Sequence, residues 1–465
     1  MIEPKTFGRS SGSVERGAGS AGTMKGNVID WVRLRRAKRS ETYRELRDIT
    51  TPQELREFQE ARLKALLLHA YASVPYYHRV FGEIGLIHGG AVDMSKFDRI
   101  PVLTKDILRR FTKELVSKDL DKRRWFYNTS GGSTGEPIRV VQDDDFLRWA
   151  TATDFYYYAH MLRIAEPVAR RVIIWGSERD FWTGSVGIQA RLENRLTHVL
   201  FLNSYRMSKS DMELYIDKIT AFRPELIRGY AHALFDLCDY ALRNKRSLYA
   251  PNAVVSSAEL LTESMRHVIE LAFETHVFDF YGSREVSGLA GECEKGRMHQ
   301  FSFFNQLEVL DEHDQPVGGN EEGRVVVTNL ANYAMPLIRY EMGDTVVRGD
   351  NVCACGSPLP TLQRVTGRVG DHFVTRDGTM IDANYFDFHF ESRDSIRKYQ
   401  IIQEDYDRVK IVVVLNRSLS DGDRDDIEKK IRFVMGDCEI LWEVVDDIPT
   451  TPSGKYTYVR SLVHR

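Results

Sequence analysis

Cysteine is scarce in this chain, with five residues in 465. That number is too small for a disulfide framework in a protein of this length, and it indicates a reducing, cytoplasmic location. No apolar run reaches the roughly 18 residues that a membrane span requires. Residues 1–26 are rich in glycine, serine and charge, and they lack the apolar segment of a secretory signal. We therefore predict a cytoplasmic protein with no membrane partner and a disordered segment at 1–26.

An excess of charge of one sign is also missing. The formal net charge is -3, from 64 Lys and Arg against 67 Asp and Glu. This balance argues against nucleic acid as the main partner. The length that is present allows two or three domains and a large buried core.

The spacing of apolar residues divides the rest of the chain into regions. Residues 26–77 have apolar side chains at helical spacing. From 125 to 362, short strand-like runs such as RVIIW (171–175) alternate with helical segments, which predicts an α/β domain with a largely parallel sheet. Beyond 367 the pattern predicts a compact α+β domain of roughly 100 residues. We place a large domain at 27–367 and a small one at 368–465.

The most distinctive segment is YNTSGGSTGEPIRV, residues 127–140. Glycine lets the backbone approach a ligand, and Ser and Thr hydroxyls add donors for phosphate oxygens. The segment lies between an expected strand and an expected helix that starts near Asp144, as phosphate-binding loops do. It is not a P-loop with a Gly-Lys-Ser/Thr ending, because Glu136 follows the last glycine. Composition alone also allows an ordinary flexible turn.

Cysteine and histidine provide a second signal, at Cys293, His299, Cys353 and Cys355. Three thiolates and one imidazole make a complete tetrahedral Zn²⁺ site. With no open position, such a site would be structural and would fix the end of the large domain. The alternative is free cysteines beside an unrelated histidine.

Four further segments follow the glycine-rich one. They are FYGSREVSG at 280–288, MPLIRYEMGD at 335–344, TGRVGD at 366–371 and PTTPSGKY at 449–456. In this order and spacing the segments resemble the core motifs of the adenylate-forming superfamily of acyl-CoA synthetases and adenylation domains. The closer likeness is to the phenylacetate–CoA ligase branch and its capsule-biosynthesis relatives, and it covers nearly the whole chain after residue 26. It implies an α/β fold: a large N-terminal adenylate-forming domain with mixed sheets and helices, and a small mobile α+β C-terminal domain.

The resemblance implies a reaction in two steps. A small carboxylic acid, possibly aromatic, attacks the α-phosphate of ATP to give an acyl-adenylate and pyrophosphate, and an acceptor, usually the thiol of coenzyme A, then displaces AMP. Such chemistry needs positioning and charge neutralisation more than a protein nucleophile. Two alternatives stay open: transfer to an amine or a carrier-protein thiol, and a non-catalytic zinc-stabilised nucleotide-binding protein.

Roles follow by motif position. The resemblance assigns the β- and γ-phosphates to the loop residues Thr129, Ser130, Gly131, Gly132, Ser133, Thr134 and Gly135. It assigns Mg²⁺ to Glu285, the adenine face to Tyr281 and both ribose hydroxyls to Asp344. Ser257, Ala258, Glu259, Gly282 and Ser283 would line the nucleotide pocket.

The remaining roles concern the domain boundary and the acid. Lys455 would bridge the substrate carboxylate and the α-phosphate, Arg368 would lie near the ribose and phosphate, and Gly370 occupies the hinge position. Candidates for the acyl pocket are Trp175, Tyr205, Tyr230, His232 and Phe280, with Arg206 and Arg228 as basic candidates. Aromatic residues at such positions are also common in cores.

Overall fold

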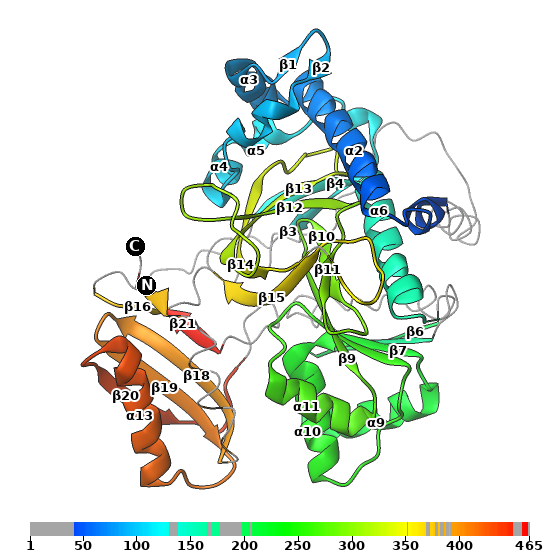
Figure 1. Ribbon diagram of the computed structural model, residues 1–465. Helices are drawn as coiled ribbons and strands as arrows, with labels where there is room; N and C mark the ends of the chain where they lie inside the picture. Colours follow the sequence, from blue (N-terminus) through cyan, green and yellow to red (C-terminus); the bar gives the residue numbers. More distant parts are fainter. Residues whose placement is uncertain are drawn as a thin grey trace, which may run out of the picture.

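The computed structural model describes residues 41–129, 138–164, 170–175, 198–204, 207–350, 352–368, 373–376, 380, 381, 386, 390, 393, 395–449 and 458–463. Figure 1 shows an N-terminal helical region, a large sheet covered by helices, and a smaller unit of sheet and helix formed by C-terminal residues. The segment 1–26, predicted to be disordered, lies outside the described residues. Within the described ranges, no helix has the length and apolar character needed to cross a membrane.

Helix α2 (Pro52–Ser73) begins with a capping box, in which the side chains of Thr51 and Glu54 each accept a hydrogen bond from the other's backbone N–H. Its buried side chains include Leu63, Leu66 and Leu67, which confirms the helical spacing. Pro75 ends α2 and starts α3 (Pro75–Ile84), because proline disfavours helix at the preceding residue and suits the first position of the next. The short elements that follow are β1 (Ile87–His88), β2 (Ala91–Val92), η1 (Met94–Arg99), α4 (Lys105–Arg110), α5 (Thr112–Leu115) and η2 (Leu120–Lys122).

The central sheet has 11 strands in the order β12-β13-β14-β15-β11-β10-β9-β8-β7-β5-β6. Strands β9, β8, β7, β5 and β6 are parallel, whereas the others pair antiparallel. The prediction of a largely parallel sheet is therefore wrong for the second half, where short connections replace crossover helices. The bounds are β5 (Arg171–Ile174), β6 (Val199–Leu202), β7 (Leu226–Tyr230), β8 (Ala253–Ser257), β9 (Val277–Ser283), β10 (Ser287–Glu292), β11 (Met298–Gln300), β12 (Asn305–Leu310), β13 (Glu322–Asn329), β14 (Tyr340–Arg348) and β15 (Thr361–Arg368).

The sheet curls strongly. Three strands separate β9 from β14, which in a flat sheet would place them about 19 Å apart at roughly 4.8 Å per step. Yet the hydroxyl of Tyr281 on β9 lies 2.8 Å from Oδ2 of Asp344 on β14. The two side chains can meet only because the antiparallel half folds over toward the parallel half.

Helices cover both faces of the parallel half (Figure 1). Ile227 and Val254 point toward α9 (Lys209–Phe222), α10 (Ala231–Arg243) and α11 (Glu263–Phe273). Their neighbours Leu226 and Val255 point to the opposite face, as the two-residue period of a strand requires. There they pack with α6 (Asp144–Phe155) and the π-helical turn η3 (Tyr156–Met161).

The glycine-rich segment joins two strands. β3 (Trp125–Thr129) and β4 (Arg139–Asp143) form an antiparallel hairpin, and residues 130–137 between them lie outside the described residues. The expected helix start at Asp144 is confirmed, with Asp143 Oδ1 accepting from the backbone N–H of Phe146. Strand β4 follows the loop and leads directly into this helix.

The C-terminal residues form the predicted α+β arrangement. Helix α13 (Asp421–Met435) packs Ile427 and Ile431 against a sheet with the order β20-β19-β18-β21. The bounds are β16 (Phe373–Val374), β17 (Met380–Ile381), β18 (Ile396–Asp405), β19 (Arg408–Leu415), β20 (Glu439–Val444) and β21 (Val459–Ser461). The domain boundary at 367/368 stays a prediction.

Side chains of the predicted large domain (27–367, here the large region) contact side chains of the predicted small domain (368–465, here the small region). Lys398 of β18 lies 3.0 Å from the carboxylate of Asp236 on α10, and Arg243 donates to Asn416 Oδ1 at 2.9 Å. Tyr458 packs on apolar residues of both regions, and its hydroxyl lies 3.4 Å from the sulfur of Met265 on α11. Tyr458, the residue before β21, therefore contacts the large region.

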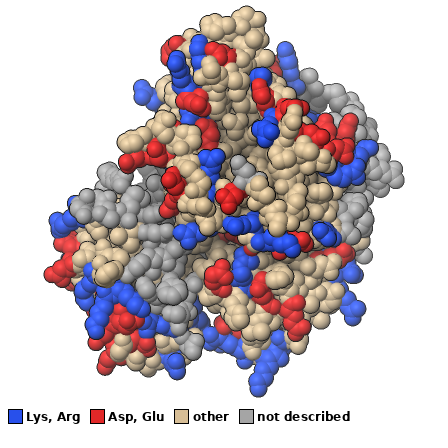
Figure 2. All heavy atoms as spheres, viewed as in Figure 1, with Lys and Arg blue, Asp and Glu red and all other residues tan. Residues whose placement is uncertain are grey.

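Acidic and basic side chains are interspersed on the face of the molecule drawn in Figure 2. This distribution agrees with the nearly balanced formal charge. The absence of a nucleic-acid partner stays a prediction.

Candidate nucleotide site and metal centre

Tyr281 and Asp344 form the centre of the candidate nucleotide site. The Tyr281 hydroxyl donates to Asp344 Oδ2 at 2.8 Å, and its side chain is largely buried. Asp344 is also the Cα partner of Arg368 across the β14–β15 ladder. The structure thus brings together an aromatic ring, a carboxylate and the backbone of Arg368, all three predicted to bind nucleotide.

The β3–β4 hairpin is tied to the turn that precedes Glu285. Asn128 Nδ2 donates to Gln142 Oε1 and to the carbonyl of Arg284, and Gln142 Nε2 donates to the carbonyls of Arg284 and Glu285. Thr129 donates its backbone N–H to Asn128 Oδ1. These contacts hold Thr129, where the predicted phosphate loop begins, beside Glu285. Ser130 to Gly135 lie outside the described residues.

Glu285 is a buried carboxylate with a fixed backbone. Its N–H donates to Ser283 Oγ at 3.2 Å, and only 7% of the residue is exposed. Its position beside the hairpin fits a cation that needs oxygen ligands next to phosphate, as Mg²⁺ does. At Gly282, an added Cβ would lie 2.5 Å from the carbonyl oxygen of Ser287, so a side chain there would force β9 and β10 apart.

The segment after β8 is held by contacts within the protein. Ser257 Oγ donates to the carbonyl of Phe280, and Ala258 has φ +72°, a conformation that alanine rarely adopts. Glu259 lies 2.6 Å from His232 Nδ1. Burial opposes protonation of His232, but the adjacent Glu259 carboxylate outweighs it and raises the pKa of the imidazole above its ordinary value. The nucleotide contacts assigned to these residues stay predictions.

The predicted metal ligands come together. The ligand atoms of Cys293, His299, Cys353 and Cys355 all lie within 4.8 Å of one another. Cys293 and Cys353 have their sulfurs 3.8 Å apart, and Cys355 Sγ lies 3.3 Å from His299 Nε2. A sulfur–sulfur distance of about 3.8 Å is expected when two thiolates each lie roughly 2.3 Å from a tetrahedral Zn²⁺. His299 is fully buried.

A carbonyl orients the imidazole of that centre. His299 Nδ1 lies 3.1 Å from the carbonyl of Leu359, which leaves Nε2 to face the thiols. Metal-bound histidines usually have such a partner. The donor set, its spacing and this contact fit a structural zinc ion. The other cysteines, Cys238 and Cys438, are buried among apolar side chains, as predicted.

Several predicted residues lie outside the described ranges, namely Lys455, Gly370, Tyr205 and Arg206. Of the acyl-pocket candidates, Trp175 and Tyr230 have ring centroids 4.1 Å apart, and Arg228 packs 4.4 Å from the ring of Phe280. The sequence interpretation missed Asn128 and Gln142. Their position in a hairpin that flanks the glycine-rich loop was the available signal.

Comparison with known proteins finds related chains. Residues 373–461 match the family model described as the CapK C-terminal domain. Protein CapK of Staphylococcus aureus is 25% identical over 428 residues, covering 89% of this chain and 90% of that protein. The phenylacetate-coenzyme A ligase of Thermus thermophilus is 27% identical over 343 residues, covering 70% of this chain and 73% of that protein.

The chain is similar to members of the adenylate-forming superfamily, as its motifs indicated. Its relatives in the superfamily include the phenylacetate–CoA ligases and CapK, which confirms the branch that the motifs indicated. A crystal structure of 2-hydroxyisobutyryl-CoA ligase in the postadenylation state, in complex with 2-HIB-AMP, aligns with a TM-score of 0.68 at 17% identity, covering 90% of this chain and 91% of that chain. The same enzyme in the thioesterification state aligns with a TM-score of 0.55 at 17% identity, covering 89% and 90%. These similarities confirm the predicted fold class.

Tyr281→Phe is expected to raise the Kd for AMP about three- to tenfold. The substitution keeps the ring but removes the hydrogen bond that orients Asp344, which is worth about 1 kcal/mol. Isothermal titration of AMP measures the effect, with Tyr127→Phe as the control because Tyr127 is exposed. An unchanged Kd in Tyr281→Phe would show that Asp344 does not depend on this hydroxyl.

Proposed function

We propose that this AMP-forming acid ligase activates a carboxylic acid with ATP and transfers the acyl group to the thiol of coenzyme A. The observation that supports this proposal is the hydrogen bond between Tyr281 and Asp344, which the curl of the sheet brings together. Glu285 lies beside the β3–β4 hairpin, where its carbonyl accepts a hydrogen bond from Gln142. The relatives named phenylacetate-coenzyme A ligase point to the same reaction.

In the first step, an oxygen of the substrate carboxylate attacks the α-phosphorus of ATP, and the bond to the β-phosphate breaks to release pyrophosphate. We assign the ribose hydroxyls to Asp344 and the adenine face to Tyr281. Mg²⁺ held by Glu285 would neutralise phosphate charge. The β3–β4 loop would hold phosphate through N–H and O–H donors, because Glu136 supplies no positive charge.

In the second step, the thiol of coenzyme A attacks the acyl carbon, its proton passes to solvent, and the bond to AMP breaks. Lys455 is assigned to the substrate carboxylate and the α-phosphate, so it would act in the first step. Arg368 is assigned to a position near the ribose and phosphate. The Cys293, His299, Cys353 and Cys355 cluster would hold a structural zinc ion, since all four positions around the metal are filled.

Acid-dependent exchange of labelled pyrophosphate into ATP tests the first step. Exchange with at least one acid from a broad panel supports the ligase, whereas nucleotide binding without exchange for any acid would favour a non-catalytic nucleotide-binding protein. The acceptor is identified by mass spectrometry after coenzyme A, amines or a carrier protein is added to the adenylate. An amide product, of the kind suggested by the name of the amide bond synthetase McbA (TM-score 0.51), would replace the thioester proposal.

A further inference from the structure

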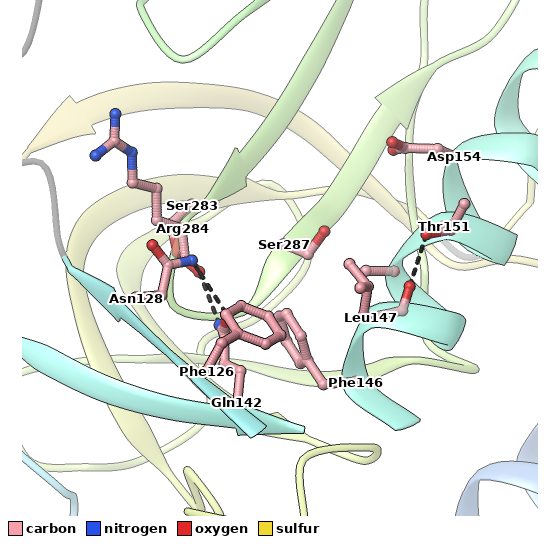
Figure 3. Close-up of a pocket in the computed structure, with 11 residues that line it drawn as sticks. Phe126, Asn128, Gln142, Phe146, Leu147, Thr151, Asp154, Ser283, Arg284 and Ser287 are labelled. Atoms are coloured by element: carbon pink, nitrogen blue, oxygen red, sulfur yellow. Dashed lines mark hydrogen bonds between the residues drawn. The ribbon is translucent and has the colours of Figure 1, made fainter. Parts of the chain in front are cut away.

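A cavity of about 280 Å³ adjoins the phosphate end of the candidate site. It lies between α6, the β3–β4 hairpin and the turn from β9 to β10 (Figure 3). Asn128 on its wall directly precedes Thr129, and Arg284 on its wall directly precedes Glu285. Its volume lies just below the range for small-molecule sites, about 300–1,000 Å³. The cavity therefore suits a compact ligand close to the reacting phosphate.

Most polar groups on the wall are already bonded within the protein. Asn128 donates to Gln142 Oε1, and Gln142 donates to the carbonyl of Arg284. The hydroxyl of Thr151 donates to the carbonyl of Leu147 at 2.6 Å. Phe126 and Phe146 provide apolar surface. These groups give the cavity shape but leave little hydrogen-bonding capacity for a ligand.

Asp154 differs from the other groups on the wall. It projects from α6 into the cavity in Figure 3, and 35% of its side chain is exposed. A carboxylate accepts hydrogen bonds at two oxygens with several lone pairs. Arg284 is the other charged residue of the wall, but its guanidinium points away from the cavity in Figure 3. Asp154 is thus the charged group of the wall that faces the cavity.

Arg228 is the ion-pair partner of the Asp154 carboxylate. Its Nη1 lies 3.5 Å from Asp154 Oδ2 and donates to the hydroxyl of Tyr158 at 2.8 Å. The guanidinium packs on the ring of Phe280 and is 17% exposed. Its Nε is buried and, among the described residues, has no hydrogen-bond partner. Tyr158 belongs to the π-helical turn η3, and such turns are frequent at functional sites.

The charges of this group restrict the ligand. Asp154 lines the cavity and its partner Arg228 does not, so a second carboxylate on the ligand would meet Asp154 first and be repelled. An ammonium group would compete with Arg228 for the same carboxylate, and either ion would lose its hydration. A hydroxyl group loses less on leaving water and donates a charge-assisted hydrogen bond to Asp154.

We propose that this cavity receives the acyl part of the substrate and that Asp154, positioned by Arg228, accepts a hydrogen bond from a hydroxyl group on it. The substrate class is then a compact hydroxy acid whose carbon skeleton packs against Phe126 and Phe146. This inference rests on the proposed acid activation.

Matched pairs of acids test the proposal on the wild-type protein. The pairs are 4-hydroxybenzoate with benzoate, 4-hydroxyphenylacetate with phenylacetate, and 2-hydroxyisobutyrate with isobutyrate. In pyrophosphate exchange, kcat/KM for the hydroxylated member of at least one pair should exceed that of its partner roughly 10- to 100-fold. Equal or higher values for every unsubstituted acid would overturn the proposal.

Asp154→Asn tests the assigned residue. The amide keeps the shape of the side chain but is a weaker hydrogen-bond acceptor. The kcat/KM for the hydroxylated acid should therefore fall at least fivefold, whereas the kcat/KM for the unsubstituted acid should stay the same. Asp144→Asn is the matched control, because Asp144 is an exposed acid on the same helix and pairs with Arg124. A preference that is the same in Asp154→Asn and wild type would contradict the role of Asp154.

Equilibrium binding of the same acids, followed by ligand-observed NMR on the full chain with AMP present, separates this inference from the proposed function. Hydroxyl-dependent binding without any exchange would support the cavity assignment and overturn acid activation. Exchange with no hydroxyl preference in either measurement would retain acid activation and overturn the cavity assignment. Neither binding nor exchange with any acid would overturn both.

Discussion

Lys455→Ala is expected to lower the rate of acid-dependent adenylation about 10²- to 10³-fold, while the Kd for ATP changes less than about threefold. An ammonium group at the attacking carboxylate and the α-phosphate opposes charge that develops in the transition state, and such interactions act mainly on rate. ATP binding would persist because Tyr281, Asp344 and Glu285 belong to the large region. The contact of Tyr458 with Met265 places β21, which follows Lys455 in the chain, beside that region.

Single-turnover release of pyrophosphate measures the rate, and titration with a non-hydrolysable ATP analogue measures the Kd. Lys429→Ala is the control, because Lys429 is exposed on α13 of the same small region. Wild-type release of pyrophosphate by Lys455→Ala would refute the role assigned to the lysine. A rate and an affinity that fall together would instead assign Lys455 to ATP binding.

Cys353→Ser is expected to remove about one equivalent of zinc and to lower the free energy of unfolding by about 3–4 kcal/mol. A metal that binds only the folded chain stabilises it by this amount when present at a few hundred to a thousand times its Kd. The substitution removes one thiolate of four, and the remaining ligands no longer close the tetrahedron.

Metal content by mass spectrometry and thermal unfolding check this expectation. Cys438→Ala should keep the metal, because Cys438 is buried in the small region away from the cluster. Wild-type protein purified with no metal near one equivalent would end the zinc proposal. Zinc retained by Cys353→Ser would show that this thiol is not a ligand.

Sequence reasoning predicted residue types better than their arrangement. The motifs identified Tyr281 and Asp344 individually, but their hydrogen bond depends on the curl of the sheet, which brings residues 63 positions apart together. The metal cluster was predictable because thiols and imidazole are few and chemically distinctive. The pairing of β11 with β15, at His299 and Thr361, helps to bring its halves together.

The group formed by Asp154, Arg228 and Tyr158 was not predictable beyond Arg228 as a basic candidate. Arg228 and Tyr158 are 70 positions apart, and a π-helical turn has no distinctive residue pattern. The prediction of a largely parallel sheet included too many strands for a related reason. Strand-like runs after β9 look alike in sequence, and only the length of their connections separates hairpins from crossovers.

The curl of the sheet also makes the candidate nucleotide site depend on both halves of the sheet. Strands β10, β11 and β15 lie between β9 and β14, so the contact of Tyr281 with Asp344 depends on the pairing of the antiparallel half as well as the parallel half. We therefore expect nucleotide to stabilise only chains in which both halves of the sheet are paired. The stabilisation would be about 2.7 kcal/mol at a nucleotide concentration one hundred times its Kd.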